Sequence, residues 1–497
     1  MVEQDFELLQ EGDEEENSDL VQFEEESSWS LIKRLGAGAS CGFLLGFETV
    51  VFVGLRPLVQ SELGISCFAL ENLLSFFPLA LMGTPLVLGS QLPKHLQNFS
   101  KLPFFLFCGI LFVSSGLLVI RSANLYSIFF GQLLAGVGIS GLILLHMEYL
   151  VNISTPIHRG KTVGSIQLGV GIGVTFAHLM DIIFSSTPGG YKYAFVFLPV
   201  VASILVVIFV AIQDPLPTMN TQIPFKKGGS LPWILGGGLV ILQQCSGEPN
   251  VLYYAKEIFE RLGFCDGVRA SSAAFSVSFV QIVASGISLF LVDRMGRRLI
   301  LIFGTLAMTL STGLLSIEEL SSGREWEPPI CRNNYTFNYD AVPETCNEES
   351  PKKFEVIVLI SLVFYVFSYS MSLGTVSWIL ISELSKCVAN PFKFIGWILS
   401  INWMCRLLIY ETFYEATKIL SLGGVLLSYS FFSFAAFLFI AFLVPETRNK
   451  PLHNIAVFIQ KSSVHDLMRK NVFFWKDGAN VDGSTSYSAL RENANNI

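Results

Sequence analysis

Apolar residues gather into long blocks along this chain, separated by short polar stretches. Blocks such as "FFLFCGILFVSSGLLVI" and "YAFVFLPVVASILVVIFVAI" belong to runs of about 18 to 25 residues, long enough for a helix to cross roughly 30 Å of hydrocarbon. Because lipid offers no water, a spanning segment must satisfy its own backbone hydrogen bonds. The pattern predicts an all-α membrane protein with twelve transmembrane helices. These are expected to begin near Leu31, Ala69, Leu102, Leu125, Lys161, Tyr193, Leu231, Ser271, Leu299, Phe354, Phe392 and Gly424.

The stretch "QDPLPTMNTQIPFKKGGS" between the sixth and seventh blocks is rich in proline, glycine and polar residues. It divides the predicted helices into two equal sets. Such halves are typical of transporters built from two repeated bundles with a midplane site between them. The predicted organisation is an acidic disordered tail over 1–30, a first six-helix bundle over 31–212, a linker over 213–230, a second bundle over 231–444 and a tail over 445–497.

Composition supports the membrane class. The chain is 52% hydrophobic and only 14% charged, against roughly a quarter charged in soluble domains, which excludes a soluble enzyme with one large core. The net charge of −8 arises from acids in the first 26 residues, which predict a solvated cytoplasmic tail. No signal-peptide pattern precedes the first block, so that block is expected to be retained. Lys and Arg in the short loops place both termini in the cytoplasm.

Small residues and cysteines add two expectations. Glycine at helical spacing, as in "GAGASCGFLLG" and "GVGIGV", predicts close helix packing in lipid. The nine cysteines show no CxxC or Cys/His spacing, so no metal is expected. The long outer loop 318–353 holds Cys331, Cys346 and the sequon at Asn334. An exofacial position suits both a Cys331–Cys346 disulfide and glycosylation at Asn334.

Three stretches together resemble a known family. They are "QQCSGEPNVLYYA" at 243–255, "DRMGRR" at 293–298 and "PETR" at 445–448. In this order they are similar to the sugar porters of the major facilitator superfamily, the facilitative glucose transporters, over about residues 32–448. "EPN" is similar to the Gln-Pro-Asn of the class III branch, members ten and twelve. The resemblance implies facilitative transport of a hexose or similar monosaccharide by alternating access, with no catalysis and no cofactor.

The resemblance also implies a substrate site. Within "QQCSGEPN", Gln243 and Asn250 lie at i and i+7, so their two carboxamides share a helical face. Carboxamides suit a neutral polyol because each offers donors and acceptors without a counter-charge. A lone carboxamide would equally serve as an interhelical hydrogen bond. The implied substrate contacts are Gln167, Gln243, Gln244, Asn250, Gln281, Trp378, Glu383, Asn402 and Trp403.

A cytoplasmic gating motif is implied as well. Its residues are Arg159, Asp293, Arg294, Gly296, Arg297, Arg298 and Glu446. Several charges that the family carries are replaced by neutral residues: Gln132, Asn152 and Asn390 stand in their places, and "GSQLPKHLQNFSK" follows the second block. Losing such pairs is expected to favour the inward-open conformation, by about 1 kcal/mol for each exposed pair.

Glu48 is an acid within the first predicted helix. Without its usual cationic partner it is expected to be protonated and hydrogen-bonded to Gln132. A role in proton coupling is the second interpretation, because proton-coupled relatives carry an acid at this place.

Arg406 lies within the eleventh predicted helix, where an arginine needs a partner. The sequence leaves open pairing with Glu383, Glu48 or Glu411, or binding of an anionic substrate. Glu248 stands where the class III branch carries Gln, and its role is left open.

The alternatives to a passive monosaccharide carrier are a proton-coupled sugar symporter, a carrier for another small and anionic solute, and a sugar receptor without transport. Pro249 is expected to let the outer half of the seventh helix bend as a gate, with Tyr253 and Tyr254 at its end. Expected partners are a small sugar and the lipid bilayer. No basic patch indicates nucleic acid binding, and either the plasma membrane or an internal membrane fits.

Overall fold

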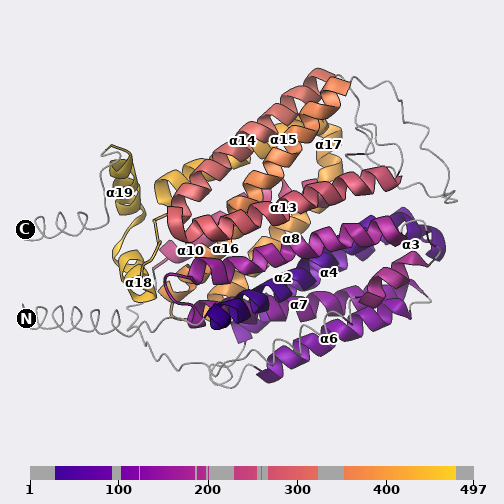
Figure 1. Cartoon of the computed structure of the whole chain (residues 1–497), viewed down its shortest axis with the longest axis horizontal. Coiled ribbons are helices and arrows are strands. Elements are labelled where there is room, and N and C mark those ends of the chain that lie inside the picture. The colour runs from indigo at the N-terminus through magenta and orange to yellow at the C-terminus, as the bar shows by residue number, and fades with distance from the viewer. Residues whose placement is uncertain are drawn as a thin grey trace, which may run out of the picture.

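The computed structural model is a bundle of long helices that lie roughly side by side (Figure 1). The helices of the first half of the chain lie together, and those of the second half pack beside them (Figure 1). The structure describes residues 28–91, 102–121, 124–184, 187, 189–197, 200, 229–253, 259, 267–322 and 352–476.

The helices follow the predicted apolar blocks. The first half contributes α2 (Ser28–Gly54), α3 (Arg56–Leu63), α4 (Cys67–Gln91), α6 (Leu102–Ile120), α7 (Leu125–Ile153) and α8 (Arg159–Phe184). The second half contributes α10 (Leu231–Cys245), α11 (Glu248–Tyr253), α13 (Gly267–Met295), α14 (Arg297–Ser322), α15 (Lys352–Met371), α16 (Leu373–Leu384), the 3-10 helix η1 (Ser385–Cys387) and α17 (Pro391–Leu443). Two shorter helices end the described chain, α18 (Leu452–Lys461) and α19 (Val464–Lys476).

Nine helical segments of the described ranges are long and apolar enough to cross a membrane. Among them, α15 and α16 form one continuous segment, and α17 contains two, Pro391–Phe413 and Glu415–Leu443. The second of these is interrupted near its start at Ser421, a residue with φ 63°. Of the other predicted spans, the second is α4, whose apolar part is Ser75–Ser90, and the seventh is divided into α10 and α11. The sixth falls largely outside the described residues. The all-α membrane class is confirmed.

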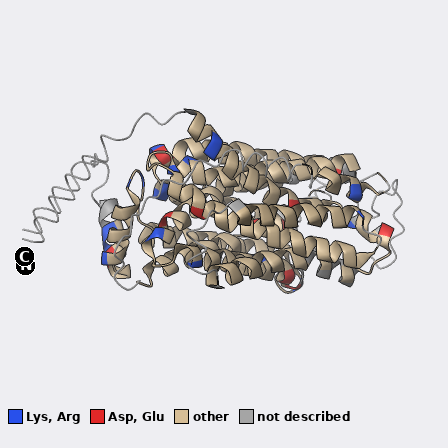
Figure 2. Ribbon diagram, turned by 90° about the horizontal axis from the view of Figure 1, so that it is seen from below, with Lys and Arg blue, Asp and Glu red and all other residues tan. Residues whose placement is uncertain are grey.

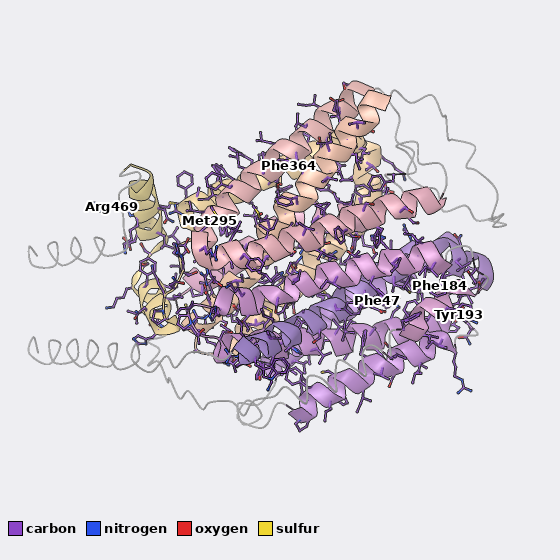
Figure 3. The ribbon with its side chains drawn as sticks, in the orientation of Figure 1. Phe47, Phe184, Tyr193, Met295, Phe364 and Arg469 are labelled. Carbon is purple, nitrogen blue, oxygen red and sulfur yellow. The ribbon has the colours of Figure 1, made fainter. Side chains whose placement is uncertain are left out.

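One end of the bundle carries α18 and α19 and the other carries α3, and they are called the α18 end and the α3 end (Figure 1). Charged residues concentrate at these ends, while the middle is mostly uncharged (Figure 2). Figure 3 places Met295 at the α18 end and Phe184 at the α3 end, so α8 and α13 run in opposite directions. Phe364 of α15, in the middle, is 48% exposed. An apolar middle between charged ends suits a lipid environment.

Glycines bring helices close together, as the sequence predicts. Within the first half, Gly42 and Gly46 of α2 face the backbone of Ile166 and Val170 on α8. Between the halves α8 packs on α13 and α4 packs on α17. There a Cβ added to Gly396 of α17 would lie 2.5 Å from the Pro85 carbonyl of α4. These close contacts leave little room for side chains between the helices.

The predicted seventh helix is broken at Gly247, which has φ 97° and separates α10 from α11. Glycine takes this backbone conformation without the steric penalty of a Cβ. Pro249 is the second residue of α11, a first-turn position that needs no backbone donor. The bend expected at Pro249 is therefore made two residues earlier, and proline starts the following helix.

The predicted tenth helix is also broken. Ser372, with φ −112° and ψ −95°, separates α15 from α16. The hydroxyl of Thr375 donates to the Ser370 carbonyl at 2.7 Å, and Ser372 donates to the Ser368 carbonyl at 2.6 Å. Side-chain hydroxyls thus add hydrogen bonds to backbone carbonyls next to the break.

The segment after Leu443 forms α18 and α19 at one end of the bundle (Figure 1). α18 packs on α16 and η1. α19 is held to α17 by Asn471, whose amide donates to the Phe442 carbonyl at 2.9 Å. Part of the predicted C-terminal tail is thus folded against the bundle.

Candidate functional site

Five carboxamides are buried in the middle of the second half. Gln243 and Gln244 come from α10, Asn250 from α11, Gln281 from α13 and Asn402 from α17, and each is at most 3% exposed. Burying so many amides is costly unless each finds a hydrogen-bonding partner. Their gathering from four helices marks the candidate site.

For Gln243 and Gln244, the amide nitrogen is used to orient the side chain. Gln243 donates to the Tyr369 hydroxyl and to the Leu373 carbonyl, both at 3.1 Å. Gln244 donates to the Asn402 side-chain oxygen at 2.6 Å. In these pairs the amide nitrogen is occupied, so the carbonyl oxygen of each glutamine is left for another partner.

Asn250 shows the same arrangement. Its amide donates to the Tyr429 hydroxyl at 2.5 Å and to the Ile409 carbonyl at 3.4 Å. Tyr429 also lies against Gly247, where an added Cβ would meet its ring. The start of α11 is therefore tied to the two spans of α17.

Several buried polar atoms at this place have no hydrogen-bond partner among the described residues. They are Oε1 of Gln243, Oε1 of Gln244, Oδ1 of Asn250, both amide atoms of Gln281, Oγ of Ser370 and Nε1 of Trp403. An unpaired buried polar group costs about 1–3 kcal/mol, so such a concentration needs an explanation. A bound polar molecule with many hydroxyl groups would supply the missing partners.

A small cavity adjoins these atoms. It is lined by Glu248, Val251, Gln281, Tyr365, Val366, Tyr369 and Ser370. Its volume of about 10 Å³ is the room of roughly one water molecule. A larger ligand does not fit this cavity unless the lining residues move apart.

The first half of the chain contributes Gln167. It lies on α8, is 8% exposed, and its amide nitrogen is 3.3 Å from where a Cβ on Gly374 of α16 would stand. Trp378 of α16 is half-buried and packs on the core, and Trp403 is buried beside Asn402. Gln281 faces Gly171 of α8. The candidate site thus lies where α8 meets the second half.

Glu383 lies in a different group from the carboxamides. Its Oε1 is 3.6 Å from Nη1 of Arg159 and 3.5 Å from Nη2 of Arg297. Arg297 also pairs with Asp293 at 3.3 Å, and Asp293 accepts the backbone N–H of Lys161 at 3.2 Å. The sequence grouped Glu383 with the substrate contacts, whereas its contacts are those of a charge cluster at the α18 end.

The other predicted motif residues join this cluster. Glu446 accepts the backbone N–H groups of Arg297 and Arg298, at 3.0 and 3.1 Å, and so caps the first turn of α14. Gly296, with φ 99°, lets the Glu446 carboxylate approach the backbone. Arg298 donates to the Ala441 carbonyl at 2.7 Å, while Arg294 is exposed.

Contacts between the halves remain at this end despite the replaced charges. The Arg159–Glu383 pair and the Lys161–Asp293 hydrogen bond both join α8 to the second half, and Arg159 also donates to the Lys450 carbonyl at 3.2 Å. Asn390 caps α17 by accepting the Lys393 N–H at 3.0 Å. The α18 end is closed in this conformation.

Glu48 and Gln132 form the predicted pair. The amide of Gln132 on α7 donates to Oε1 of Glu48 on α2 at 3.0 Å, and both side chains are buried. The predicted hydrogen bond between Glu48 and Gln132 is confirmed. Proton coupling stays a separate prediction.

Arg406 pairs with Glu248, a partner that the sequence did not suggest. Nη1 of Arg406 lies 3.3 Å from Oε2 of Glu248, and both side chains are nearly buried. The partners considered from sequence are engaged elsewhere: Glu383 with two arginines, Glu48 with Gln132, and Glu411 with the Ser75 hydroxyl.

Sequence reasoning also missed the tyrosines of the site. Tyr365 and Tyr369 lie at i and i+4 on α15 and share one face. Buried tyrosine hydroxyls need partners, so this spacing in an apolar block was a usable signal. Tyr254, Asn334, Cys331 and Cys346 fall outside the described residues, and Tyr253 ends α11.

The fold and the site together define a helical membrane protein of two packed halves with a polar site between them. Residues 38–323 match the family profile of the Major Facilitator Superfamily, and residues 220–458 match that of "Sugar (and other) transporter". The chain belongs to the Major Facilitator Superfamily.

Named relatives match over most of their length. Facilitated glucose transporter member 10 of Mus musculus is 25% identical, over 85% of this chain and 92% of that protein. Member 12 of Xenopus laevis is 22% identical, over 84% of this chain and 87% of that protein. The D-xylose transporter of Levilactobacillus brevis is 23% identical, over 86% of this chain and 96% of that protein.

Solved structures share the fold. The proton:xylose symporter XylE bound to 6-bromo-6-deoxy-D-glucose superposes with a TM-score of 0.71 at 18% identity, over 87% of this chain and all of that one. The human organic anion transporter MFSD10 superposes with a TM-score of 0.60 at 12% identity, over 84% of this chain.

Proposed function

We propose that this protein carries a hexose or a similar monosaccharide passively across a membrane by alternating access. The observation that carries the proposal is the set of buried, unpaired carboxamide atoms in the second half, where Gln281 faces α8 of the first half. A monosaccharide offers hydroxyl donors and acceptors around its rim, which match neutral amides. Its apolar ring face suits an aromatic ring such as Trp403. The relatives named as glucose and xylose transporters support this choice of substrate class.

The two ends of the bundle supply the gates. The α18 end, proposed to be cytoplasmic, is closed by Arg159–Glu383 and Lys161–Asp293. At the α3 end, proposed to be exofacial, Ser271 of α13 donates to Asp181 of α8 at 2.6 Å. Transport requires that contacts at one end break while those at the other end hold, so that the site opens to one side at a time.

The alternatives are distinguished by uptake into proteoliposomes. The full chain is tested with radiolabelled hexoses, pentoses and sugar acids, with and without a proton gradient. Facilitated transport predicts saturable uptake of a neutral monosaccharide that ceases when concentrations are equal on both sides. Accumulation driven by the gradient would indicate symport, and binding without uptake would indicate a receptor. Neither binding nor uptake of any neutral monosaccharide would overturn the proposal.

Gln281 gives the sharpest test of the site. Both atoms of its amide lack partners among the described residues, so Gln281→Met removes no structural hydrogen bond and should not lower the thermal unfolding temperature. The same change should lower kcat/KM for the sugar roughly tenfold, the size of one lost hydrogen bond of about 1.4 kcal/mol. Gln460→Met on α18, away from the site, serves as the matched control. A loss of stability with transport unchanged would assign Gln281 a structural role instead.

A further inference from the structure

Glu248 and Arg406 form an ion pair beside the candidate site. Glu248 begins α11 and Arg406 lies on the first span of α17. Nη1 of Arg406 is 3.3 Å from Oε2 of Glu248. The Arg406 Nε also donates to the Tyr410 hydroxyl at 3.2 Å, and its guanidinium lies 5.6 Å from the ring centres of both Trp403 and Tyr410. The guanidinium is thus held in one orientation.

Each charge needs the other. The two residues are only 6% and 8% exposed, and an uncompensated charge at such depth is strongly unfavourable. Both positions also differ from the family that the sequence resembles. The class III branch of that family carries Gln at the position of Glu248, and the family carries a neutral polar residue at the position of Arg406. The structure brings these two positions into contact, so the positive charge of Arg406 compensates the negative charge of Glu248.

A shared cavity and hydrogen bonds connect the pair to the substrate site. The Tyr369 hydroxyl accepts from Gln243 at 3.1 Å, and Tyr369 and Glu248 both line the small cavity. Glu248 lines the small cavity together with Gln281. On the other side Trp403, under the guanidinium, adjoins Asn402, which binds Gln244. Both members of the pair therefore contact residues of the candidate site.

We propose that this ion pair sets the charge selectivity of the site: Glu248 masks Arg406, so that neutral monosaccharides are accepted and sugar acids are rejected. The inference rests on the proposed function. A sugar carboxylate would have to displace the Glu248 carboxylate from Arg406 or lie beside it, and two adjacent carboxylates repel each other. When Glu248 becomes a neutral residue of the same shape, the planar fork of Arg406 is free to bind a carboxylate.

The test uses the full-length protein in liposomes, with radiolabelled D-glucose as the reporter and D-glucuronate or its neutral methyl ester as competitor. For the wild type, the ester should compete and the acid should not. In Glu248→Gln, the potency of D-glucuronate relative to the ester should rise roughly tenfold or more. In the double variant Glu248→Gln with Arg406→Gln, that gain should disappear. The double variant is the matched control because it removes both charges.

The outcomes separate the two proposals. If the wild type neither binds nor transports any neutral monosaccharide, the proposed function and the charge selectivity both fail. If the wild type responds to D-glucose but D-glucuronate competes as well as its ester, only the charge selectivity fails. It also fails if Glu248→Gln gains no response to the acid, or if the double variant retains the gain. If Glu248→Gln does not purify as folded protein, the wild type still tests the proposal. The charge selectivity then fails if D-glucuronate competes with D-glucose as well as its methyl ester does.

Discussion

The hydroxyl of Tyr365 donates a hydrogen bond of 2.9 Å to the backbone carbonyl of Ser246, directly after the end of α10. In return, Gln243 of α10 donates to the carbonyl of Leu373, where α16 begins, at 3.1 Å. Each interrupted helix therefore donates a side-chain hydrogen bond to the backbone of the other next to its break. The two breaks form one polar junction next to the candidate site, so a movement of α11 is expected to disturb the break between α15 and α16.

Tyr365→Phe tests this junction. The change keeps the ring but leaves the buried Ser246 carbonyl without its side-chain donor, at a cost of about 1–3 kcal/mol. Thermal unfolding in detergent should shift to lower temperature, and sugar uptake should slow. Tyr126→Phe, at a residue that is 71% exposed, is the control and should change neither. An unaltered unfolding temperature in Tyr365→Phe would show that the contact contributes nothing.

Serine hydroxyls join the halves at the α3 end in two matching places. Ser271 of α13 donates to Asp181 of α8 at 2.6 Å, and Ser75 of α4 donates to Glu411 of α17. Ser271→Ala removes one hydrogen bond to a charged group, worth about 1.5–3 kcal/mol. The population open at the α3 end should rise roughly tenfold or more.

Spin labels at residues 66 and 321, both exposed and on opposite halves, report this opening as a longer distance in pulsed electron resonance. Ser276→Ala is the control on the same helix, because among the described residues the Ser276 hydroxyl donates to the Ser272 carbonyl of its own helix. An unchanged distance distribution in Ser271→Ala would argue that this contact does not hold the α3 end closed.

Glu383→Gln tests the assignment of Glu383 to the gate. Its carboxylate is fully buried and pairs with Arg159 and Arg297. Removing one member of a buried ion pair costs about 3–5 kcal/mol, so the α18 end should open more readily and the unfolding temperature should fall. The affinity for the sugar in the conformation open at the α3 end should stay close to that of the wild type. If the variant had normal stability and a large loss of affinity for the sugar, Glu383 would be a substrate contact and not a gate residue.

Glu48→Gln tests passive transport against proton coupling. The substitution keeps the shape of the side chain and leaves its oxygen able to accept from Gln132, as Glu48 does at 3.0 Å. For a protonated structural glutamate, uptake and its dependence on pH should both be close to those of the wild type. Initial rates of sugar uptake across a range of external pH provide the measurement. Wild-type accumulation driven by a proton gradient and lost in the variant would establish coupling through this residue.

Sequence alone was sufficient for the class of protein. Apolar blocks of about 20 residues satisfy their backbone in lipid by forming helices, and the structure confirms the all-α membrane class, with nine such spans among the described residues. The carboxamides at Gln243 and Gln244 were also visible from sequence, because they lie in one short motif on one helix. The spacing within one helix brings these two side chains together, and this does not depend on how the other helices pack.

Tertiary structure decided which distant residues meet. Glu248 and Arg406 are 158 positions apart, and no local pattern relates them. Gly247 and Pro249 were both present in the motif, but the close approach of Tyr429 favours the turn at Gly247. Glu383 joined the arginines because α16 passes from the site to the α18 end. A buried charge is stabilised by whatever partner packing brings within a few ångströms, and that choice depends on how the helices pack.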